Sequence, residues 1–348
     1  MAALLARNGL DATVVVLTSG VGDRYTLHDM LAQEWLPEFD TLALAGRTRL
    51  TPCSGSTDLE REILLTLLGG PVEFRFQDLA SLLSSIRVRC NIVNAARRTA
   101  LNFDTEGIER PIADWNYHET TGFTVRPGRP LADALIAATQ PGPTGRRYAF
   151  SCYRATEYII LLALAQEMAD HNPSLLAALE RQWQRRAIAS RQFHDTFVHE
   201  YGTFDAPLPV RYYVPGDRLW FRNPHEPSSD VTGYEGSWVF YLGSGLFSNF
   251  WHPERPYTLA AKCLEIFHWR HGLLHEQSGA PYIDETLVEA HVAKSLRDSR
   301  ETSAILERMM RFRDPSGVYE HGGCIDRTRE YPRSVCIGNE ELVLPTNG

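Results

Sequence analysis

The segment "RRYAFSCYRATEYIILLALAQEM" (residues 146–168) places a cysteine directly before a long apolar stretch. The apolar stretch predicts a helix that begins near Cys152 and ends before Pro173, because proline cannot continue a helix. Unpaired N–H groups in the first turn of a helix favour negative charge, so a thiol placed there is readily held as a thiolate. We therefore take Cys152 as the candidate nucleophile and expect it to have a low pKa.

Composition limits the classes of protein to which the chain can belong. Its 348 residues carry a formal net charge of −8, which argues against a general nucleic-acid binder, since phosphate binding needs a basic face. No stretch approaches the roughly 20 apolar residues of a membrane span, and the N-terminus does not resemble a signal peptide. The 6 cysteines show no disulfide-like spacing. We expect a cytoplasmic protein with free thiols and with neither nucleic acid nor membrane as a partner.

The order of predicted elements indicates an α+β fold. Helical periodicity is found at 58–68, 76–102, 131–139, 152–171, 175–197, 258–274 and 285–312. Alternating aromatic and β-branched residues predict strands at 210–214, 218–223, 237–243 and 245–251, with weaker signals at 334–338 and 341–345. A helical half that carries the thiol, followed by a strand-rich half, is typical of α+β cysteine enzymes.

Several segments together resemble one known family. They are "PVEFRFQDLASLLSSIRVRCNIVNAARR", "NYHETTGF", "RRYAFSCYRATEYIILLALA" and "VPGDRLWFRNPH…GYEGSWVFYLG". In this order they resemble the bacterial spore-coat protein-glutamine gamma-glutamyltransferase (transglutaminase) family, over about residues 57–277. The resemblance implies a small papain-like fold with the nucleophile at the N-terminus of a core helix packed on an antiparallel sheet. It also implies a thioester between the cysteine and a glutamine side chain, followed by transfer of the acyl group to a lysine amine.

This resemblance also suggests how the chain is divided. We expect an N-terminal extension over residues 1–55 and a transglutaminase-like catalytic domain over 56–289. A C-terminal helical and tail extension over 290–348 is expected to pack on that domain.

The family's residues carry over only in part, which makes the chain a divergent member. The nucleophile falls on Cys152. The family's two partner carboxylates fall on Ser151 and Ser237, and its histidine falls on Phe250. Other side chains must therefore supply the acid–base chemistry if the family's activity is retained.

Glu235 and His252 are the candidate replacements. Glu235 lies two residues before Ser237, so in a strand both side chains point to the same face. Its alternative role is that of an exposed turn carboxylate. His252 returns to the family's histidine position if "SNFWHP" contains a two-residue insertion, and its alternative is an ordinary loop histidine.

Four further residues are candidates for substrate binding. His118 and Glu119 lie in "NYHETTGF", one of the segments that resemble the family. Trp238 and Phe250 replace polar residues of the family, which makes the site more apolar than that of its relatives. A hydrophobic wall would keep water away from a thioester, so that an amine reacts in its place.

Two other polar groups are expected to be structural. Glu157 lies about 140° around the helix from Cys152, and Arg154 three residues before it predicts a surface ion pair. His271 and His275 have i, i+4 spacing and His268 is near, but a third metal ligand is missing from that stretch. We expect no metal and no cofactor.

The sequence supports a cysteine acyltransferase as the first hypothesis. Cys152 would form an acyl-enzyme thioester, and an amine acceptor would take the acyl group. The acyl donor is either a protein glutamine or a thioester on a carrier protein. The alternatives are a deamidase or cysteine hydrolase that acts as an effector, and a pseudoenzyme that binds a partner.

Overall fold

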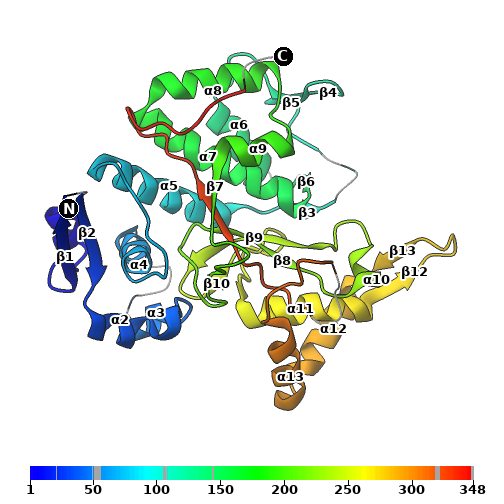
Figure 1. The fold of residues 1–348 in the computed structure, drawn as a ribbon. Coiled ribbons are helices and arrows are strands. Elements are labelled where there is room, and N and C mark those ends of the chain that lie inside the picture. Colours follow the sequence, from blue (N-terminus) through cyan, green and yellow to red (C-terminus); the bar gives the residue numbers. More distant parts are fainter. Residues whose placement is uncertain are drawn as a thin grey trace.

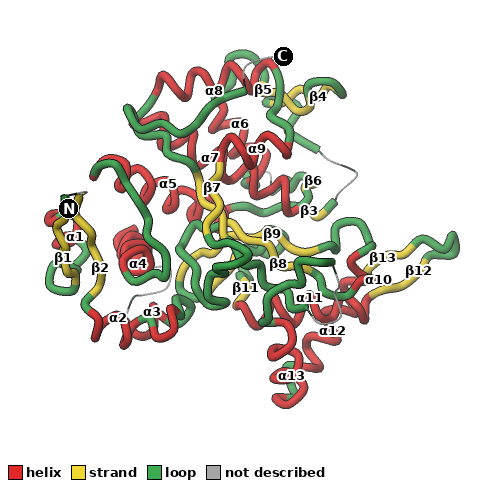
Figure 2. Tube along the Cα trace, viewed as in Figure 1, coloured by secondary structure: helices red, strands yellow, loops and turns green. Residues whose placement is uncertain are grey.

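The computed structural model of the chain describes residues 1–20, 22–48, 50, 56–104, 107, 109–142, 145–317 and 322–345. Two helical layers lie on opposite sides of a central sheet, which confirms the α+β class (Figure 1 and Figure 2). The first layer contains α5 (Leu79–Arg98), α6 (Leu131–Thr139), α7 (Cys152–His171), α8 (Pro173–Arg185) and α9 (Ser190–Phe197). The second contains α10 (Glu226–Ser229), α11 (Leu259–Gly272), α12 (Glu285–Ser295) and α13 (Ser299–Met309).

The central sheet is antiparallel and has the strand order β11-β10-β9-β8-β14-β7. Its strands are β7 (Val198–Tyr201), β8 (Arg218–Arg222), β9 (Gly236–Gly243), β10 (Leu246–Phe247), β11 (Tyr257–Thr258) and β14 (Arg329–Pro332). Side chains along β9 alternate between two cores. Phe240 and Leu242 pack in the core of α7, and Val239 and Tyr241 pack in the core of α11.

Shorter elements surround these layers. The N-terminal segment contains α1 (Ala2–Arg7), β1 (Val14–Ser19), β2 (Gly22–Leu27), α2 (Asp29–Trp35), η1 (Pro37–Phe39), α3 (Leu44–Thr48) and α4 (Ser56–Leu68). Three further strand pairs are β3 (Asn102–Phe103) with β6 (Ala149–Phe150), β4 (Trp115–His118) with β5 (Gly122–Val125), and β12 (Leu273–His275) with β13 (Pro281–Ile283). Within the described ranges, no helix has the length and apolar character needed to cross a bilayer.

Most predicted helices are present, but the one predicted over 175–197 is divided into α8 and α9, and the one predicted over 285–312 is divided into α12 and α13. Between α8 and α9, the Ala187 N–H donates to the Thr121 carbonyl at 2.9 Å, and Ile188 is buried. A backbone donor that bonds outside the helix interrupts the helical hydrogen-bond series. Hydrophobic periodicity does not reveal such an interruption.

The strand predicted over 210–214 is wrong, because these residues form a buried turn. The Tyr212 N–H donates to the Pro209 carbonyl at 3.0 Å. The Tyr213 N–H donates to Oγ1 of Thr41 at 2.8 Å. A donor that bonds the N-terminal segment is no longer free to pair with a strand.

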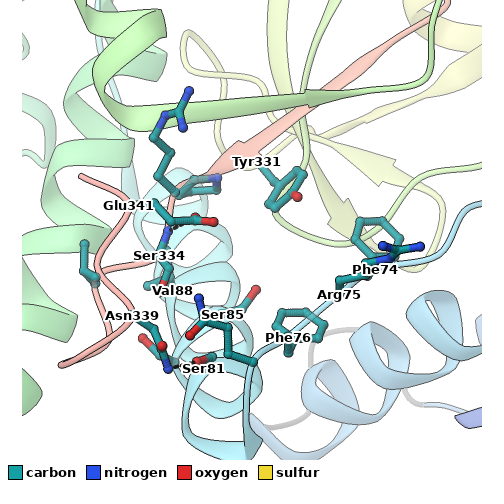
Figure 3. A pocket seen from close by; sticks show the side chains of 15 residues that line it. Phe74, Arg75, Phe76, Ser81, Ser85, Val88, Tyr331, Ser334, Asn339 and Glu341 are labelled. Atoms are coloured by element: carbon teal, nitrogen blue, oxygen red, sulfur yellow. Dashed lines mark hydrogen bonds between the residues drawn. The ribbon is translucent and has the colours of Figure 1, made fainter. Parts of the chain in front are cut away.

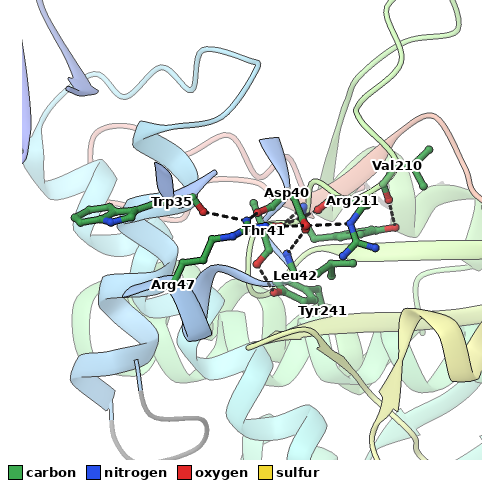
Figure 4. Close-up of polar contacts among 9 residues, drawn as sticks. Trp35, Asp40, Thr41, Leu42, Arg47, Val210, Arg211 and Tyr241 are labelled. Atoms are coloured by element: carbon green, nitrogen blue, oxygen red, sulfur yellow. Dashed lines mark hydrogen bonds and ion pairs between the residues drawn. The ribbon is translucent and has the colours of Figure 1, made fainter. Parts of the chain in front are cut away.

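Polar contacts around Asp40 attach the N-terminal segment to the sheet (Figure 4). The Asp40 carboxylate pairs with Arg211 at 3.0 Å and with Arg47 at 3.5 Å. The Thr41 N–H donates to the Arg211 carbonyl at 3.1 Å, and the Tyr241 hydroxyl donates to the Thr41 carbonyl at 3.3 Å. Because Tyr241 belongs to β9, the N-terminal segment directly supports that strand.

The C-terminal segment supplies β14 and then runs along α5 without forming the strands predicted at 334–338 and 341–345 (Figure 3). The Ser334 N–H donates to a Glu341 carboxylate oxygen at 2.8 Å, and the Asn339 amide donates to Oγ of Ser81 at 2.8 Å. Hydrogen bonds to side chains therefore hold the segment in place without a neighbouring strand. The small pocket left between this segment and α5 is lined by none of the predicted site residues.

A buried ion pair joins the first helical layer to the sheet. Arg89 on α5 donates from Nη1 to Oδ1 of Asp217 at 2.8 Å, and the two side chains are 1% and 0% exposed. Asp217 stands in the turn before β8 and also accepts hydrogen bonds from the Val214 N–H and the Tyr201 hydroxyl. Gly216 has a φ of +90°, and a Cβ there would lie 3.0 Å from the Arg89 Cα. Both its backbone conformation and this close approach require glycine.

We expect Asp217→Asn to lower the free energy of unfolding by about 3–5 kcal/mol, because the Arg89 charge is then buried without its partner. Chemical denaturation followed by circular dichroism measures this loss. Glu73→Gln is the control, since the Arg75–Glu73 pair is exposed and is expected to contribute less than about 1 kcal/mol. Equal losses in the two variants would contradict the importance of the buried pair.

Candidate functional site

Cys152 is the first residue of α7, where the sequence placed it. The Ser151 hydroxyl caps the helix by accepting a hydrogen bond from the Arg154 N–H at 3.3 Å. Ser151 stands where the family has one of its two carboxylates, and in this chain the residue serves as the helix cap. Just before it, β6 pairs in parallel with β3. Because α7 is buried along most of its length, these contacts hold its first turn in one place. Cys152 itself is partly exposed.

The edge of β9 supplies a backbone N–H to the Cys152 sulfur. Backbone donors along a strand point alternately to its two edges, and the Phe240 N–H bonds Oγ of Ser248 at 2.9 Å on the edge toward β10. Two residues earlier, the Trp238 N–H points to the same edge beyond the end of β10 and lowers the pKa of the Cys152 thiol. The Tyr153 N–H does the same from the first turn of α7. Both N–H groups therefore favour the thiolate.

Burial and charge act on this sulfur in opposite directions. Burial is the largest influence and raises the pKa of Cys152 above its ordinary value. The Trp238 N–H, the Lys262 ammonium and the Tyr153 N–H lower this pKa, and the Glu235 carboxylate raises it. The low pKa that we predicted is therefore wrong, because desolvation of the thiolate outweighs the helix terminus and the ammonium.

Lys262 on α11 is the member of this group that sequence reasoning missed. Its side chain is only 3% exposed, and its ammonium pairs with Glu265 at 3.0 Å. The ammonium also lies 3.6 Å from the centre of the Tyr257 ring. A signal was present in the sequence, since Lys262 follows Leu259 by three residues and precedes Ile266 by four. That spacing places it on the apolar face of α11, where lysine is rare unless it is paired.

Glu235 lies in the turn before β9, exposed, with its carboxylate accepting the Gly233 N–H at 3.1 Å. Its negative charge raises the pKa of the Cys152 thiol. Ser237 precedes Val239 by two residues, so its side chain faces the layer that contains α11. The family's second carboxylate position thus holds a short hydroxyl side chain, and Glu235 brings negative charge near the thiol.

The Trp238 side chain is held firmly by its neighbours. Its ring stacks on Trp220 with centroids 5.9 Å apart and meets Tyr153, the residue after Cys152, edge to face at 5.3 Å. The Arg218 guanidinium lies 4.2 Å from the centre of the Trp238 ring and 4.6 Å from that of Tyr153. Because three neighbours hold the ring, it cannot turn without disturbing them.

A second group of aromatic rings lies beside β6. Phe103 contacts Trp251 at 5.3 Å and Tyr234 at 5.8 Å between ring centroids. Phe103 is 37% exposed and belongs to the strand paired with β6, which ends two residues before Cys152. Phe250 is buried behind Trp251, with centroids 6.2 Å apart, so it supports these rings from the core side.

The other predicted site residues lie apart from this group. His252 is 57% exposed, and its Nδ1 lies 3.6 Å from a Glu254 carboxylate oxygen. His118 and Glu119 are exposed at the tip of the β4–β5 hairpin, where Nδ1 of His118 accepts the Thr120 N–H at 3.2 Å. That hairpin lies beside α8 at the top of the view, away from β9 (Figure 1). In the part of the chain that the structure describes, no hydrogen bond or ion pair joins these three residues to the thiol.

Glu157 forms the predicted ion pair with Arg154, at 2.6 Å, but the pair is not on the surface as we expected. The carboxylate is buried in α7. Burial raises the pKa of Glu157, and the Arg154 and Arg218 guanidinium groups lower it. Its ion-pair partner Arg154 lies on the same helix, which supports a structural role.

Comparison with known proteins adds two matches. The sequence model of the protein-glutamine gamma-glutamyltransferase family matches residues 45–322 of this chain. A transglutaminase from Geobacillus stearothermophilus, without its C-terminal extension, is similar in structure with a TM-score of 0.41 and 19% sequence identity. That alignment covers 62% of this chain and 98% of the other. Among curated proteins, no sequence matches the chain significantly.

We expect Lys262→Met to slow alkylation of Cys152 by iodoacetamide severalfold at fixed pH, because loss of the ammonium raises the thiol pKa further. Glu235→Gln should accelerate it, since loss of the carboxylate lowers that pKa and increases the thiolate fraction. In the wild type the rate should still rise above the pH at which an ordinary cysteine reaches its plateau. Mass spectrometry of the Cys152 peptide measures each rate.

Lys294→Met is the matched control, because Lys294 is an exposed lysine on the neighbouring helix α12. It should leave the alkylation rate unchanged. Rates that change in the same direction in the Lys262 and Glu235 variants would contradict the electrostatic account.

Proposed function

The chain belongs to the protein-glutamine gamma-glutamyltransferase family, and on that premise we propose that it is a cysteine acyltransferase. Cys152 forms an acyl-enzyme thioester and passes the acyl group to an amine. The observation that supports this best is the group around its sulfur. Two N–H groups, an ammonium and a carboxylate act there, from α7, β9, α11 and the turn before β9.

In the first step Cys152 attacks the carbonyl carbon of the donor. Glu235 takes the thiol proton, while Lys262 and the Trp238 N–H stabilise the thiolate. The S–C bond forms, the C–N bond of a glutamine carboxamide breaks, and the proton on Glu235 passes to the nitrogen that leaves as ammonia. In the second step an amine attacks the thioester, gives a proton to Glu235 and releases the sulfur, which regains that proton.

Two donor classes fit this scheme. A protein glutamine is the donor that the family name states. A thioester on a carrier protein needs less acid catalysis, because a thiolate leaves without prior protonation. The serines at the two carboxylate positions of the family, Ser151 and Ser237, favour a donor that makes this smaller demand. The donor test therefore includes both.

The aromatic surroundings favour transfer to an amine over hydrolysis. The Trp238 ring is fixed against Tyr153, the residue after Cys152, and Phe103 is an exposed ring in the second aromatic group. Apolar rings exclude water from a thioester, whereas an apolar or long-chain amine can still approach. This argues against the deamidase alternative, which needs an open polar site.

Intact-mass spectrometry after incubation with a glutamine peptide, or with an acyl-carrier thioester, tests the acyl-enzyme. We expect an adduct with the mass of the donor acyl group in the wild type and none in Cys152→Ala. Addition of a primary amine should remove the adduct and produce the amide. A folded wild-type protein that forms no adduct with either donor would instead support a binding role without catalysis.

We expect Glu235→Gln to slow acyl transfer by about 10²-fold or more, although the same substitution accelerates alkylation of the thiol. This opposite response separates acid–base catalysis from a purely electrostatic effect. His252→Ala is the matched test of the second acid–base candidate. A comparable slowing would retain His252 in the mechanism, and an unchanged rate would remove it. Single-turnover amide formation measures both.

We expect Phe103→Ala to increase the fraction of acyl-enzyme that is lost to water, because the variant admits solvent to the thioester. The ratio of acid to amide product measures this partition. Phe204→Ala is the control, since Phe204 is also exposed but stacks with Arg327 outside the two aromatic groups. An unchanged ratio in the Phe103 variant would contradict the role of its ring as a barrier to water.

A further inference from the structure

Three histidine side chains meet between α11 and α12, outside the acyl-transfer site. His268 and His271 come from α11 and His291 from α12, and their ligand-capable nitrogens all lie within 4.8 Å of one another. Nδ1 of His268 is 2.9 Å from Nδ1 of His271. The His291 ring stacks on both neighbours, at 4.6 Å from His271 and 5.7 Å from His268.

The fold assembles a different set of histidines from the one that the sequence suggested. His271 and His275 have helical spacing, but α11 ends at Gly272 and His275 belongs to β12. His268 instead lies one turn before His271, and the packing of α12 against α11 brings His291 to them. The third ligand that was missing from the sequence stretch is therefore supplied from another helix.

The geometry is close to that of a three-histidine metal site. Imidazole nitrogens bind Zn²⁺ at about 2.0–2.1 Å, so two of them on a tetrahedral ion lie about 3.3 Å apart. Metal binding requires the stacked His291 ring to rotate relative to its neighbours, so that the three nitrogens converge on one ion. The second nitrogen of His268, Nε2, lies 2.8 Å from Oγ of Ser295. Such a partner on the far side of the ring commonly orients a metal-binding histidine.

Two of the three imidazoles, His268 and His271, lie in surroundings that disfavour a positive charge. Burial, together with the neighbouring His271, His291 and Arg270, lowers the pKa of His268 to about 4. Burial and nearby cations likewise lower the pKa of His271, while Glu301 raises it. The neutral imidazole is the form that can donate a lone pair to a metal ion.

We propose that His268, His271 and His291 form a binding site for a divalent transition-metal ion, Zn²⁺ foremost. His268 is buried, His271 is exposed and His291 is partly buried, so the fourth position opens to solvent and takes water. The ion ties α11 to α12 and so fixes the helix that also carries Lys262. The site is independent of the acyl-transfer proposal, because none of its ligands acts on the Cys152 sulfur.

Equilibrium titration of the metal-stripped full chain with Zn²⁺, in competition with a chromophoric chelator, tests the site. We expect one ion per chain. His271→Gln and His291→Gln should each weaken binding by more than about 100-fold, and Ser295→Ala by about 10–100-fold. His271 is exposed, so its variant should fold normally, and circular dichroism checks this. His275→Gln is the matched control and should bind like the wild type.

Co²⁺ in place of Zn²⁺ supplies a second readout that does not depend on affinity. The visible absorption of a tetrahedral Co²⁺ site should be present in the wild type and in His275→Gln, and should be lost in His271→Gln. Zn²⁺ binding that is equal in the wild type and the His271 and His291 variants would overturn the proposal. Loss of binding in His275→Gln alone would overturn it as well, and so would a wild type that binds no ion.

Discussion

The ion pair between Arg89 and Asp217 is the constraint on which the rest of this structure depends. Asp217 directly precedes β8, so its attachment to α5 sets the position of the sheet relative to the first helical layer. Since α7 packs on α5 and β9 pairs with β8, the same contact sets where the first turn of α7 meets the edge of β9. The thiol lies at that meeting point, and its N–H donor from Trp238 exists only while the two layers keep this alignment.

This position explains the mixed electrostatics of the thiol. A sulfur between two layers loses water, which favours its protonated form, while N–H groups and an ammonium from both layers favour the thiolate. Oxidants attack thiolates, so a thiol that rests protonated is protected from them. The same position lets Lys262, from the layer on the opposite side of the sheet, act on a nucleophile carried by α7.

The parts of the fold that depend on local pattern could be read from the sequence. Cys152 as the start of a core helix, the strands β8 and β9, and the α+β order all follow from spacing and from neighbours in the chain. The turn at 210–214 could not be read from the sequence, because the Tyr213 N–H donates to Thr41, which is distant in the sequence. Lys262 was missed for a similar reason, since a buried lysine is informative only when its position on a helix face is set beside its charged neighbours. The net direction of the Cys152 pKa depends on desolvation, which a linear sequence does not contain.

The insertion of β14 between β8 and β7 has a consequence for how the protein is made. Arg218 on β8 bonds Glu330 on β14 across 112 positions of the chain, so the sheet cannot close until Glu330 has left the ribosome. Contacts of such long sequence separation form late and slowly. A nascent chain that already contains Cys152 but not yet β14 is therefore still without the complete sheet that supports the site. Reactive chemistry is thereby withheld from the crowded surroundings of the translating ribosome.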